Sequence, residues 1–456
     1  MQAATHKQVP KMLSERQRLV FGFVSILILV LVLAGTASIP FFFESSSILY
    51  KFGFNRILLL TGQVMGLVAG CLLLVQVILA ARLKFLDQVW GLDRLFKFHR
   101  INGIITAALV IIHPLVIFIA DDRISIPLQW RYWPEFVGLF LMLLIVIMVV
   151  TSCWRIGLGL AFHRWWPIHR TAAIIAVVAF GVHVLSVNDT FEQRLPQVLA
   201  IVALILCGLI FLWIRTRIIR NRRKPLRVAA VEAAAADAVC LKLVADDPHL
   251  PAHLPGQFGF FSLSSEAVAS EEHPFTIASS PTEADGLEII VRTSGDWTAQ
   301  LKHLQPQDRV LMDGPYGLFS HLRAGEQKEI IMIAGGIGIT PMLSMLRYMA
   351  DHNEPRSITL IWSNQSPEHI VLPYVFEKLA ARLNRLRVVH VMTRTAEYTG
   401  EQGRLDRPAL KRLLSDCSRT AAVFVCGSDQ MMKAVRSWLV SLGFERRMVF
   451  MEHFNL

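Results

Sequence analysis

Six long apolar segments in the first half of the chain restrict the folds that it can adopt. The segments are residues 19–41, 57–81, 101–120, 136–153, 171–187 and 196–214. Each is long enough to cross a bilayer, allowing for tilt, and a helix satisfies the backbone polar groups of such a segment in lipid. The second half has no comparable run, so the hydrophobic fraction of 54% averages two unlike halves. We expect a multidomain membrane protein with six transmembrane helices over residues 19–214.

Basic residues at the ends of the apolar segments indicate how these segments are oriented. The formal net charge is +11, and Lys and Arg concentrate in residues 7–18, 82–100 and 215–224. Cytoplasmic loops of membrane proteins are enriched in these residues. We therefore expect both termini, including the N-terminal segment 1–18, on the cytoplasmic side of a plasma or bacterial inner membrane. Because the charge reports topology, it does not indicate a nucleic-acid partner.

The basic start followed by an apolar run is also typical of a signal peptide. The run extends from about Val20 to Phe43, whereas the apolar region of a signal peptide has about 7–15 residues. This length favours a first membrane helix that is retained in the mature protein.

Two pairs of histidines accompany the apolar segments at one common spacing. His99 and His113 are 14 positions apart, and so are His169 and His183. On an α-helix this spacing puts both members of a pair on one face, about 21 Å apart. With six spans the two helices run in the same direction. His99 then matches His169 in depth on the cytoplasmic side, and His113 matches His183 towards the outside.

These histidines are candidates for haem ligands. Polar residues inside a membrane are costly and point to a function, and a haem needs only two axial ligands because the porphyrin supplies four nitrogens. One shared metal ion is ruled out by the separation of about 21 Å within a pair, and two histidines rarely complete another catalytic metal site. The scattered cysteines argue against an iron–sulfur domain. The alternative is a structural role, with each histidine hydrogen-bonded to a neighbouring helix.

The second half of the chain divides into two regions with different patterns. After a basic linker at 215–225, short β-rich segments alternate with Gly and Pro breaks over 226–322, which is typical of a small antiparallel β-barrel. Residues 323–456 alternate strands with helices, which indicates a parallel α/β sheet covered on both faces. The alanine-rich stretch 229–238 is of low complexity and has no predicted element.

A glycine-rich turn lies between an apolar strand and a predicted helix in the last region. Gly335, Gly336 and Gly338 would let the backbone approach a pyrophosphate at the start of that helix. Cys426-Gly427 follows another strand, at the sheet edge where open α/β sheets bind ligands. Cys426 is either a packed small residue or a neighbour of a nicotinamide ring.

A third motif runs through His273-Pro-Phe-Thr-Ile-Ala-Ser-Ser-Pro281 and continues in Ile290–Thr298. Thr276 and Ser279 supply hydroxyl groups, and Arg292 supplies a guanidinium that matches the geometry of a phosphate. Taken alone, these residue types suggest an anionic ligand of the β-rich region.

Together the segments resemble the ferric reductase and NADPH oxidase family, over about residues 15–456. The resemblance implies a six-helix, two-haem membrane domain fused to a ferredoxin-reductase-like FAD and NAD(P)H module. It implies an FAD site made of His273, Pro274, Phe275, Thr276, Ile277, Arg292, Gly295, Trp297 and Thr298. It implies an NAD(P)H site made of Gly335, Gly336, Gly338, Thr340, Pro341, Cys426 and Gly427. The resemblance also implies that Thr276 and Cys426 lie beside the reacting atoms. Phe454 would shield the flavin where nicotinamide must enter.

One departure from the family pattern concerns the choice of nucleotide. Phagocyte-type oxidases have Cys-Arg after the second strand of the nucleotide-binding region, where this chain has Ser363-Asn364. That Arg would contact the 2′-phosphate, so both NADPH and NADH stay open. Arg394 and Arg404 could supply the missing positive charge.

The expected function is that of a transmembrane flavohaem oxidoreductase. Electrons would pass from cytoplasmic NAD(P)H through FAD and two b-type haems to an extracytoplasmic Fe(III) chelate, or to dioxygen with release of superoxide. The alternatives are an electron-transfer subunit that serves a quinone or a periplasmic partner reductase, and a non-redox transporter with a nucleotide-regulated tail. No obligate protein partner is indicated.

Overall fold

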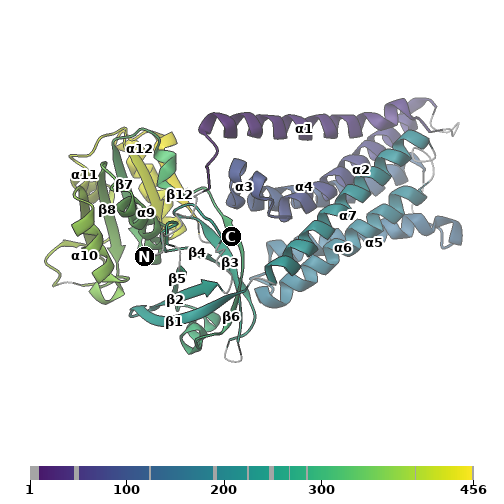
Figure 1. Cartoon of the computed structure of the whole chain (residues 1–456). Helices are drawn as coiled ribbons and strands as arrows, with labels where there is room; N and C mark the ends of the chain where they lie inside the picture. Colours follow the sequence, from purple (N-terminus) through teal and green to yellow (C-terminus); the bar gives the residue numbers. More distant parts are fainter. Residues whose placement is uncertain are drawn as a thin grey trace. The chain divides into compact units, whose positions relative to one another are not determined.

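The chain forms two compact units, a membrane unit of Ser14–Arg217 and a second unit that contains Ile218–Leu456 (Figure 1). The computed structural model describes residues 10–45, 51–122, 125–187, 193–222, 225–245, 251–265, 268–283, 286–395 and 397–453. The division follows the contrast between the apolar first half and the mixed second half of the sequence.

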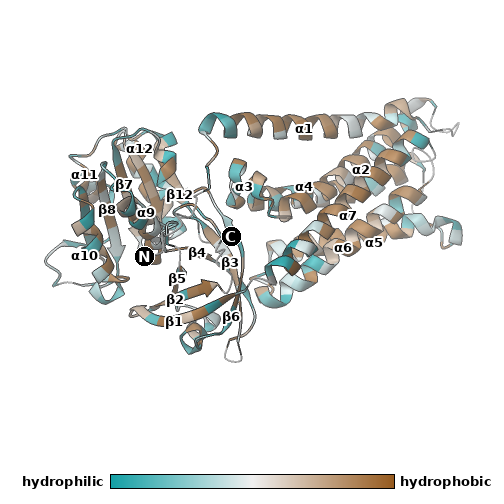
Figure 2. Cartoon of the chain, viewed as in Figure 1, coloured by the Kyte–Doolittle hydropathy of each residue, from teal (hydrophilic) through white to brown (hydrophobic). Residues whose placement is uncertain are grey.

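Six helices are long and apolar enough to cross a membrane, which confirms the predicted number of spans. The helices of this half are α1 (Glu15–Phe42), α2 (Gly53–Ala80), α3 (Lys84–Trp90), α4 (Leu92–Ala120), α5 (Trp133–Cys153), α6 (Phe162–Ser186) and α7 (Arg194–Arg222). All but the short α3 are largely hydrophobic along their length (Figure 2). The chain is a multi-pass membrane protein.

Helices α4 and α6 begin well before the apolar runs that predict them. Helix α4 starts at Leu92 and α6 at Phe162, so each gains about two turns of basic and aromatic residues. Such residues suit a membrane interface, where the charged ends stay hydrated while the rings and stems contact lipid. The added turns carry His99 and His169, so both members of each histidine pair lie on one helix, as their spacing predicts.

Alanine side chains fill the space between the two histidine levels. Ala107 of α4 and Ala176 and Ala179 of α6 pack together with Leu141 and Ile145 of α5. Helix α4 also packs along α2, and α6 packs along α5. Small residues let membrane helices approach closely, so the region between the histidine levels is tightly packed.

Six antiparallel strands form the domain that follows, here called the antiparallel domain, in the order β4-β3-β6-β1-β2-β5. Its elements are β1 (Leu226–Ala235), β2 (Ala238–Ala245), β3 (Phe258–Ser264), β4 (Glu272–Thr276), β5 (Leu287–Arg292), α8 (Asp296–Gln300) and β6 (Arg309–Tyr316). A β-bridge between Ile277 and Ile289 joins the end of β4 to β5, the two edges of this order. The sheet thereby closes on itself, in agreement with the predicted barrel.

The alanine-rich stretch 229–238 forms most of β1 and the turn into β2. Alanine has a low β propensity, but Ala234 and Ala238 are buried in a core that includes side chains from the end of the chain. The backbone N–H of Ala236 also donates to the carbonyl oxygen of Glu368. Tertiary contacts therefore form this hairpin where the sequence pattern predicts no element.

The last region, here called the parallel domain, is a six-stranded parallel sheet in the order β10-β9-β8-β7-β11-β12. Its strands are β7 (Glu329–Gly335), β8 (Ser357–Asn364), β9 (Leu386–Met392), β10 (Glu401–Gln402), β11 (Ala422–Cys426) and β12 (Val449–Glu452). Its α-helices are α9 (Thr340–Asp351), α10 (Pro373–Arg382), α11 (Arg407–Leu413) and α12 (Asp429–Ser441). Helices α9 and α10 cover one face, and α11 and α12 cover the other, which confirms the predicted fold.

Candidate functional site

The 113/183 pair, His113 of α4 and His183 of α6, is anchored identically on both sides. Nδ1 of His113 lies 2.8 Å from the carbonyl oxygen of Gly62, and Nδ1 of His183 lies 2.8 Å from that of Pro134. A ring nitrogen at this distance from a carbonyl oxygen donates a proton, so Nε2 of each histidine keeps its lone pair.

Each of these rings rests on a glycine one turn beyond the carbonyl that anchors it. A Cβ atom on Gly66 would lie 2.9 Å from Nδ1 of His113, and one on Gly138 would lie 2.6 Å from Cε1 of His183. A larger residue at either position would displace the ring. Neither glycine was predicted from the sequence, although each stands four positions after the residue whose carbonyl anchors the ring.

The 99/169 pair, His99 and His169, brings two rings face to edge. Their centroids are 6.4 Å apart, and the ring planes meet at 67°. Imidazole nitrogens bind metals at about 2.0–2.1 Å, so two rings on one metal have their centroids about 6 Å apart. Trp165 packs against His169 with a centroid distance of 4.7 Å, and the Gln76 side chain donates to the His99 carbonyl oxygen at 2.9 Å.

Both pairs fit axial ligation of a haem on the chemistry of their donor atoms. In the 113/183 pair, each ligand donates its second ring N–H to a carbonyl, as metal-bound histidines commonly do. In the 99/169 pair, the ring separation leaves room for one iron atom. The four predicted histidine ligands thus lie in two pairs on α4 and α6, and their binding of haem stays a proposal.

The predicted glycine-rich turn lies where β7 passes through a short 3-10 turn into α9. Gly336 has φ of +51°, a left-handed conformation that favours glycine. Thr340 caps the turn by donating its hydroxyl to the carbonyl of Ile337 at 3.1 Å, and Pro341 occupies the first turn of α9. Proline is favoured there because that N–H has no partner in the helix. The strand–turn–helix context of the motif is confirmed.

The end of β11 meets the same turn through its backbone. A Cβ atom on Gly338 would overlap the carbonyl group of Cys426, so glycine is required for the close approach. The Cys426 side chain is fully buried, and this burial, with Glu452 nearby, raises the pKa of its thiol well above the ordinary value. The thiol therefore stays protonated and packed in the core, while Gly427 and the backbone of Cys426 face the glycine-rich turn.

Arg292 links the antiparallel domain to the glycine-rich turn. Its Nε lies 2.9 Å from a carboxylate oxygen of Asp237, in the turn between β1 and β2. Its guanidinium also lies against Gly336, where a Cβ atom would be 2.7 Å from Nη2. A cation is thus held beside the predicted phosphate-binding turn, a position that suits a pyrophosphate. The resemblance assigns Arg292 to FAD, and that role stays a proposal.

The predicted flavin motif gathers three aromatic rings. His273 and Phe275 of β4 stack with Trp297 of α8 at centroid distances of 4.1 and 6.2 Å. The Trp297 indole donates to the carbonyl oxygen of Ala269 at 2.7 Å, which fixes its plane. Trp297 is buried in the barrel core and Phe275 packs against that core, so the stack fixes β4 against α8, and contact of these residues with the flavin stays a proposal.

Other predicted flavin residues have local structural contacts. The backbone N–H of Gly295 donates to the Thr298 hydroxyl at 2.9 Å and so caps α8. The Thr276 and Ile277 side chains are buried, with Ile277 in the barrel core. Pro274 lies in β4 and is half-buried.

The two arginines predicted near the nucleotide differ in their surroundings. Arg394, just after β9, donates to the Gln365 side chain at 3.0 Å, and Gln365 directly follows Ser363-Asn364. Arg404 is exposed beyond β10. Phe454 lies outside the described residues.

Comparison with known protein families assigns each part of the chain separately. Residues 65–180 match the family described as "Ferric reductase like transmembrane component", residues 225–320 match "FAD-binding domain", and residues 332–437 match "Oxidoreductase NAD-binding domain". The chain has the ferric reductase and NADPH oxidase family architecture. Within that architecture, His99, His113 and His169 lie in the match to the membrane component and His183 lies three residues beyond its end, whereas the aromatic stack and the glycine-rich turn lie in the FAD-binding and NAD-binding matches.

Individual proteins match only part of this architecture. The chain is 31% identical to NADH-cytochrome b5 reductase 1 of Eremothecium gossypii over 182 residues, which is 38% of this chain and 62% of that protein. It is 28% identical to the glycine betaine monooxygenase reductase subunit of Chromohalobacter salexigens over 235 residues, 49% of this chain and 62% of that protein. The chain thus spans less than two thirds of the length of these relatives. A solved structure, the cytochrome b5 reductase domain of Ulva prolifera nitrate reductase, covers 50% of this chain and 97% of its own, at 22% identity and a TM-score of 0.45.

Proposed function

We propose that this protein takes electrons from cytoplasmic NAD(P)H and delivers them to an acceptor across a plasma or bacterial inner membrane. The observation that carries the proposal is the shared anchoring of His113 and His183, whose Nδ1 atoms each lie 2.8 Å from a carbonyl oxygen. This leaves Nε2 of both rings available to a metal. A histidine that only joins two helices needs one ring nitrogen, whereas a metal ligand uses both, one for the metal and one for the anchoring carbonyl.

Two haems and one flavin would complete the chain of carriers. His99 with His169, and His113 with His183, would hold two b-type haems, and the antiparallel domain would hold FAD. When bound, FAD accepts a hydride and releases electrons singly, and the haems carry single electrons. The residues of the chain orient these groups. Gly336 and Gly338 would let the backbone of the glycine-rich turn approach the NAD(P)H pyrophosphate before α9.

The acceptor would be reduced by outer-sphere transfer. With two histidines and a porphyrin as its ligands, a haem iron would have no open coordination position. An Fe(III) chelate or dioxygen would therefore take one electron without binding the metal, giving Fe(II) or superoxide. An electron-transfer subunit that passes electrons to a quinone or a periplasmic partner reductase is the alternative.

The deciding experiment uses the purified full chain in detergent with bound haem and FAD. NAD(P)H oxidation is followed under argon and in air, with and without an Fe(III) chelate, together with dye reduction that superoxide dismutase suppresses. We expect oxidation under argon only with the chelate, or oxidation in air with superoxide. Oxidation that requires an added quinone would support the alternative, and a preparation without a haem Soret band would overturn the proposal.

We propose NADPH as the preferred nucleotide, because Arg394 contacts Gln365, directly after Ser363-Asn364, where the resemblance puts an arginine that contacts the 2′-phosphate. Loss of one charge-assisted hydrogen bond costs about 1.5–3 kcal/mol. Arg394→Ala should therefore raise the KM for NADPH about tenfold or more and leave the KM for NADH unchanged. The same two KM values are measured for Arg404→Ala, the other predicted arginine, as the comparison. Equal effects on both nucleotides, or a wild-type preference for NADH, would contradict the assignment.

A further inference from the structure

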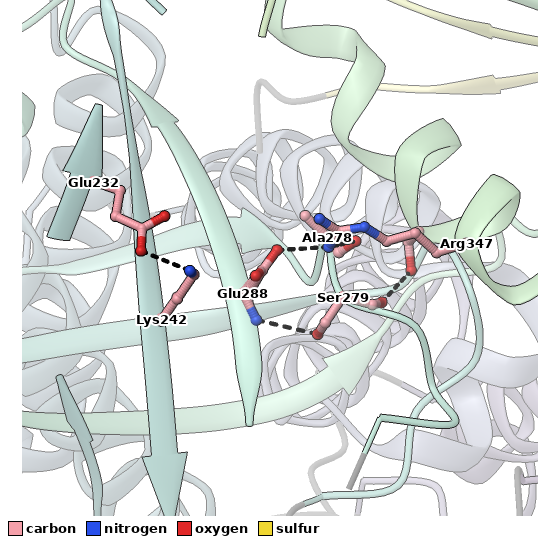
Figure 3. A network of polar contacts seen from close by, with 7 residues as sticks. Glu232, Lys242, Ala278, Ser279, Glu288 and Arg347 are labelled. Atoms are coloured by element: carbon pink, nitrogen blue, oxygen red, sulfur yellow. Dashed lines mark hydrogen bonds and ion pairs between the residues drawn. The ribbon is translucent and has the colours of Figure 1, made fainter. Parts of the chain in front are cut away.

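One face of α9 carries polar side chains that reach into the antiparallel domain. The Ser344 hydroxyl donates to the carbonyl oxygen of Ser279 at 2.8 Å. Nη1 of Arg347 donates to the carbonyl oxygen of Ala278 at 3.0 Å and to the carboxylate of Glu288 at 2.6 Å. Figure 3 shows Arg347 extending from α9 to this carboxylate.

Asp351, one turn further along the same face, makes a third contact. Its carboxylate accepts hydrogen bonds from the hydroxyls of Ser280 and Thr282, both at 2.6 Å, and pairs with Arg382 at 2.9 Å. Burial opposes the ionised form, but these donors outweigh it and lower the pKa of Asp351. The carboxylate therefore stays charged at neutral pH and keeps all three partners.

Glu288 is itself fixed by the segment that Arg347 contacts. The N–H of Ala278 donates to the carbonyl oxygen of Glu288 at 2.7 Å, and the N–H of Glu288 donates to the Ser279 hydroxyl at 3.1 Å. The ion pair is largely shielded from water, with side-chain exposures of 16% for Arg347 and 15% for Glu288. A shielded charge that loses its partner is costly, so this pair defines one arrangement of the two domains.

These contacts lie close in sequence to both candidate ligand sites. Residues 278–282 continue directly from Thr276 of the flavin motif, and α9 begins at Thr340, directly after the glycine-rich turn. A helix and a closed barrel are stiff elements. Their relative position therefore decides how far a nucleotide on the turn lies from a flavin on the motif.

We infer that Arg347 and Glu288 are positioning residues for hydride transfer, because they fix the glycine-rich turn relative to the flavin motif. The inference rests on the proposed function. It assigns to α9 a role beyond binding phosphate: the helix that starts at the nucleotide also sets the approach of nicotinamide to flavin. Misplacement of reacting groups by 1 Å can slow a reaction about a hundredfold.

The test measures flavin bleaching in the full-length protein by saturating NAD(P)H under argon, in a stopped-flow instrument. The variants are Glu288→Gln, Arg347→Ala and the conservative Arg347→Lys. The matched control is Glu232→Gln, because the Glu232–Lys242 ion pair of 2.6 Å lies wholly within the antiparallel domain, beside the network in Figure 3. FAD affinity, thermal unfolding and the nicotinamide–flavin charge-transfer absorbance are recorded for each variant.

We expect flavin bleaching to slow about tenfold in Glu288→Gln and up to about a hundredfold in Arg347→Ala. The charge-transfer absorbance should weaken, FAD affinity should change less than about twofold, and Arg347→Lys should recover part of the rate. Glu232→Gln should match the wild type. The inference is overturned if Glu288→Gln and Arg347→Lys bleach at the wild-type rate, or if the rates fall only in proportion to FAD loss. A wild-type flavin that neither nucleotide bleaches would instead overturn the proposed function, and this inference with it.

Discussion

The two histidine pairs of the membrane unit sit on the same helices but are held by different means. Nδ1 of His113 and of His183 each face a backbone carbonyl at 2.8 Å. Nδ1 of His99 is buried and has no hydrogen-bond partner within the described part of the chain. Among the described residues, Nδ1 of His169 faces the Ser152 hydroxyl, at 3.4 Å. One pair is therefore anchored by backbone, and the other is placed mainly by side-chain packing.

The difference predicts how strongly each pair binds a metal and how each tolerates change. A histidine that donates its second N–H to a carbonyl is a stronger and better oriented ligand. The anchoring of the 113/183 pair also depends on missing Cβ atoms at Gly66 and Gly138. That pair should be intolerant of added volume, whereas the 99/169 pair should tolerate changes among its neighbours.

The largest expected effect follows from removing a ligand. His113→Ala should reduce the haem content from two per chain to one, because one imidazole cannot hold a six-coordinate iron. Flavin bleaching by NAD(P)H should continue, since it does not depend on this site. Haem content is measured as the pyridine haemochrome and by the Soret absorbance.

His163→Ala is the control for this variant, because His163 is an exposed residue of α6 outside the common spacing. It should keep both haems. Two haems in His113→Ala, or a lost haem in His163→Ala, would remove the basis for comparing the two pairs.

An intermediate effect is expected from adding a methyl group beneath a ring. Gly138→Ala and Gly66→Ala should lower occupancy of the 113/183 site, because their Cβ atoms would lie 2.6 and 2.9 Å from the nearest ring atoms. Overpacking of this kind costs about 1–3 kcal/mol. Gly138→Ala, with the closer contact, should have the larger effect on haem retention.

Gly208→Ala in α7 is the matched control, since nothing lies within 4 Å of a Cβ atom built there. It should leave haem content and thermal stability at the wild-type level. If all three glycine variants lose haem equally, the rings do not depend on a glycine contact.

How much of this comparison the sequence can predict depends on the range of the contacts involved. The histidine pairs and the strand–turn–helix around Gly336 follow from local periodicity, and both were predicted. Gly66 and Gly138 were not, because glycine is common in membrane helices and only the fold shows which one faces a ring. The Arg347–Glu288 pair joins residues 59 positions apart in two domains, and no local pattern marks it.

The alanine-rich stretch 229–238 is a second case in which local sequence pattern does not predict the structure. Its composition predicts no element, yet the segment forms β1 and its turn because the parallel domain packs against it. Helices α4 and α6 also begin earlier than predicted, because hydropathy detects the apolar core of a span and misses its interfacial turns.

The smallest expected effect comes from the side chains around the 99/169 pair. Ser152→Ala removes a contact of 3.4 Å, which is longer than a strong hydrogen bond, and Trp165→Phe keeps an aromatic ring beside His169. Both variants should keep two haems and change the midpoint potential of one haem by only a few tens of millivolts, about 1 kcal/mol for a one-electron carrier. Redox titration of the Soret band measures the shift. If Ser152→Ala loses haem as readily as Gly138→Ala, the 99/169 pair relies on its weak hydroxyl contact as much as the other pair relies on its backbone, and the contrast between them fails.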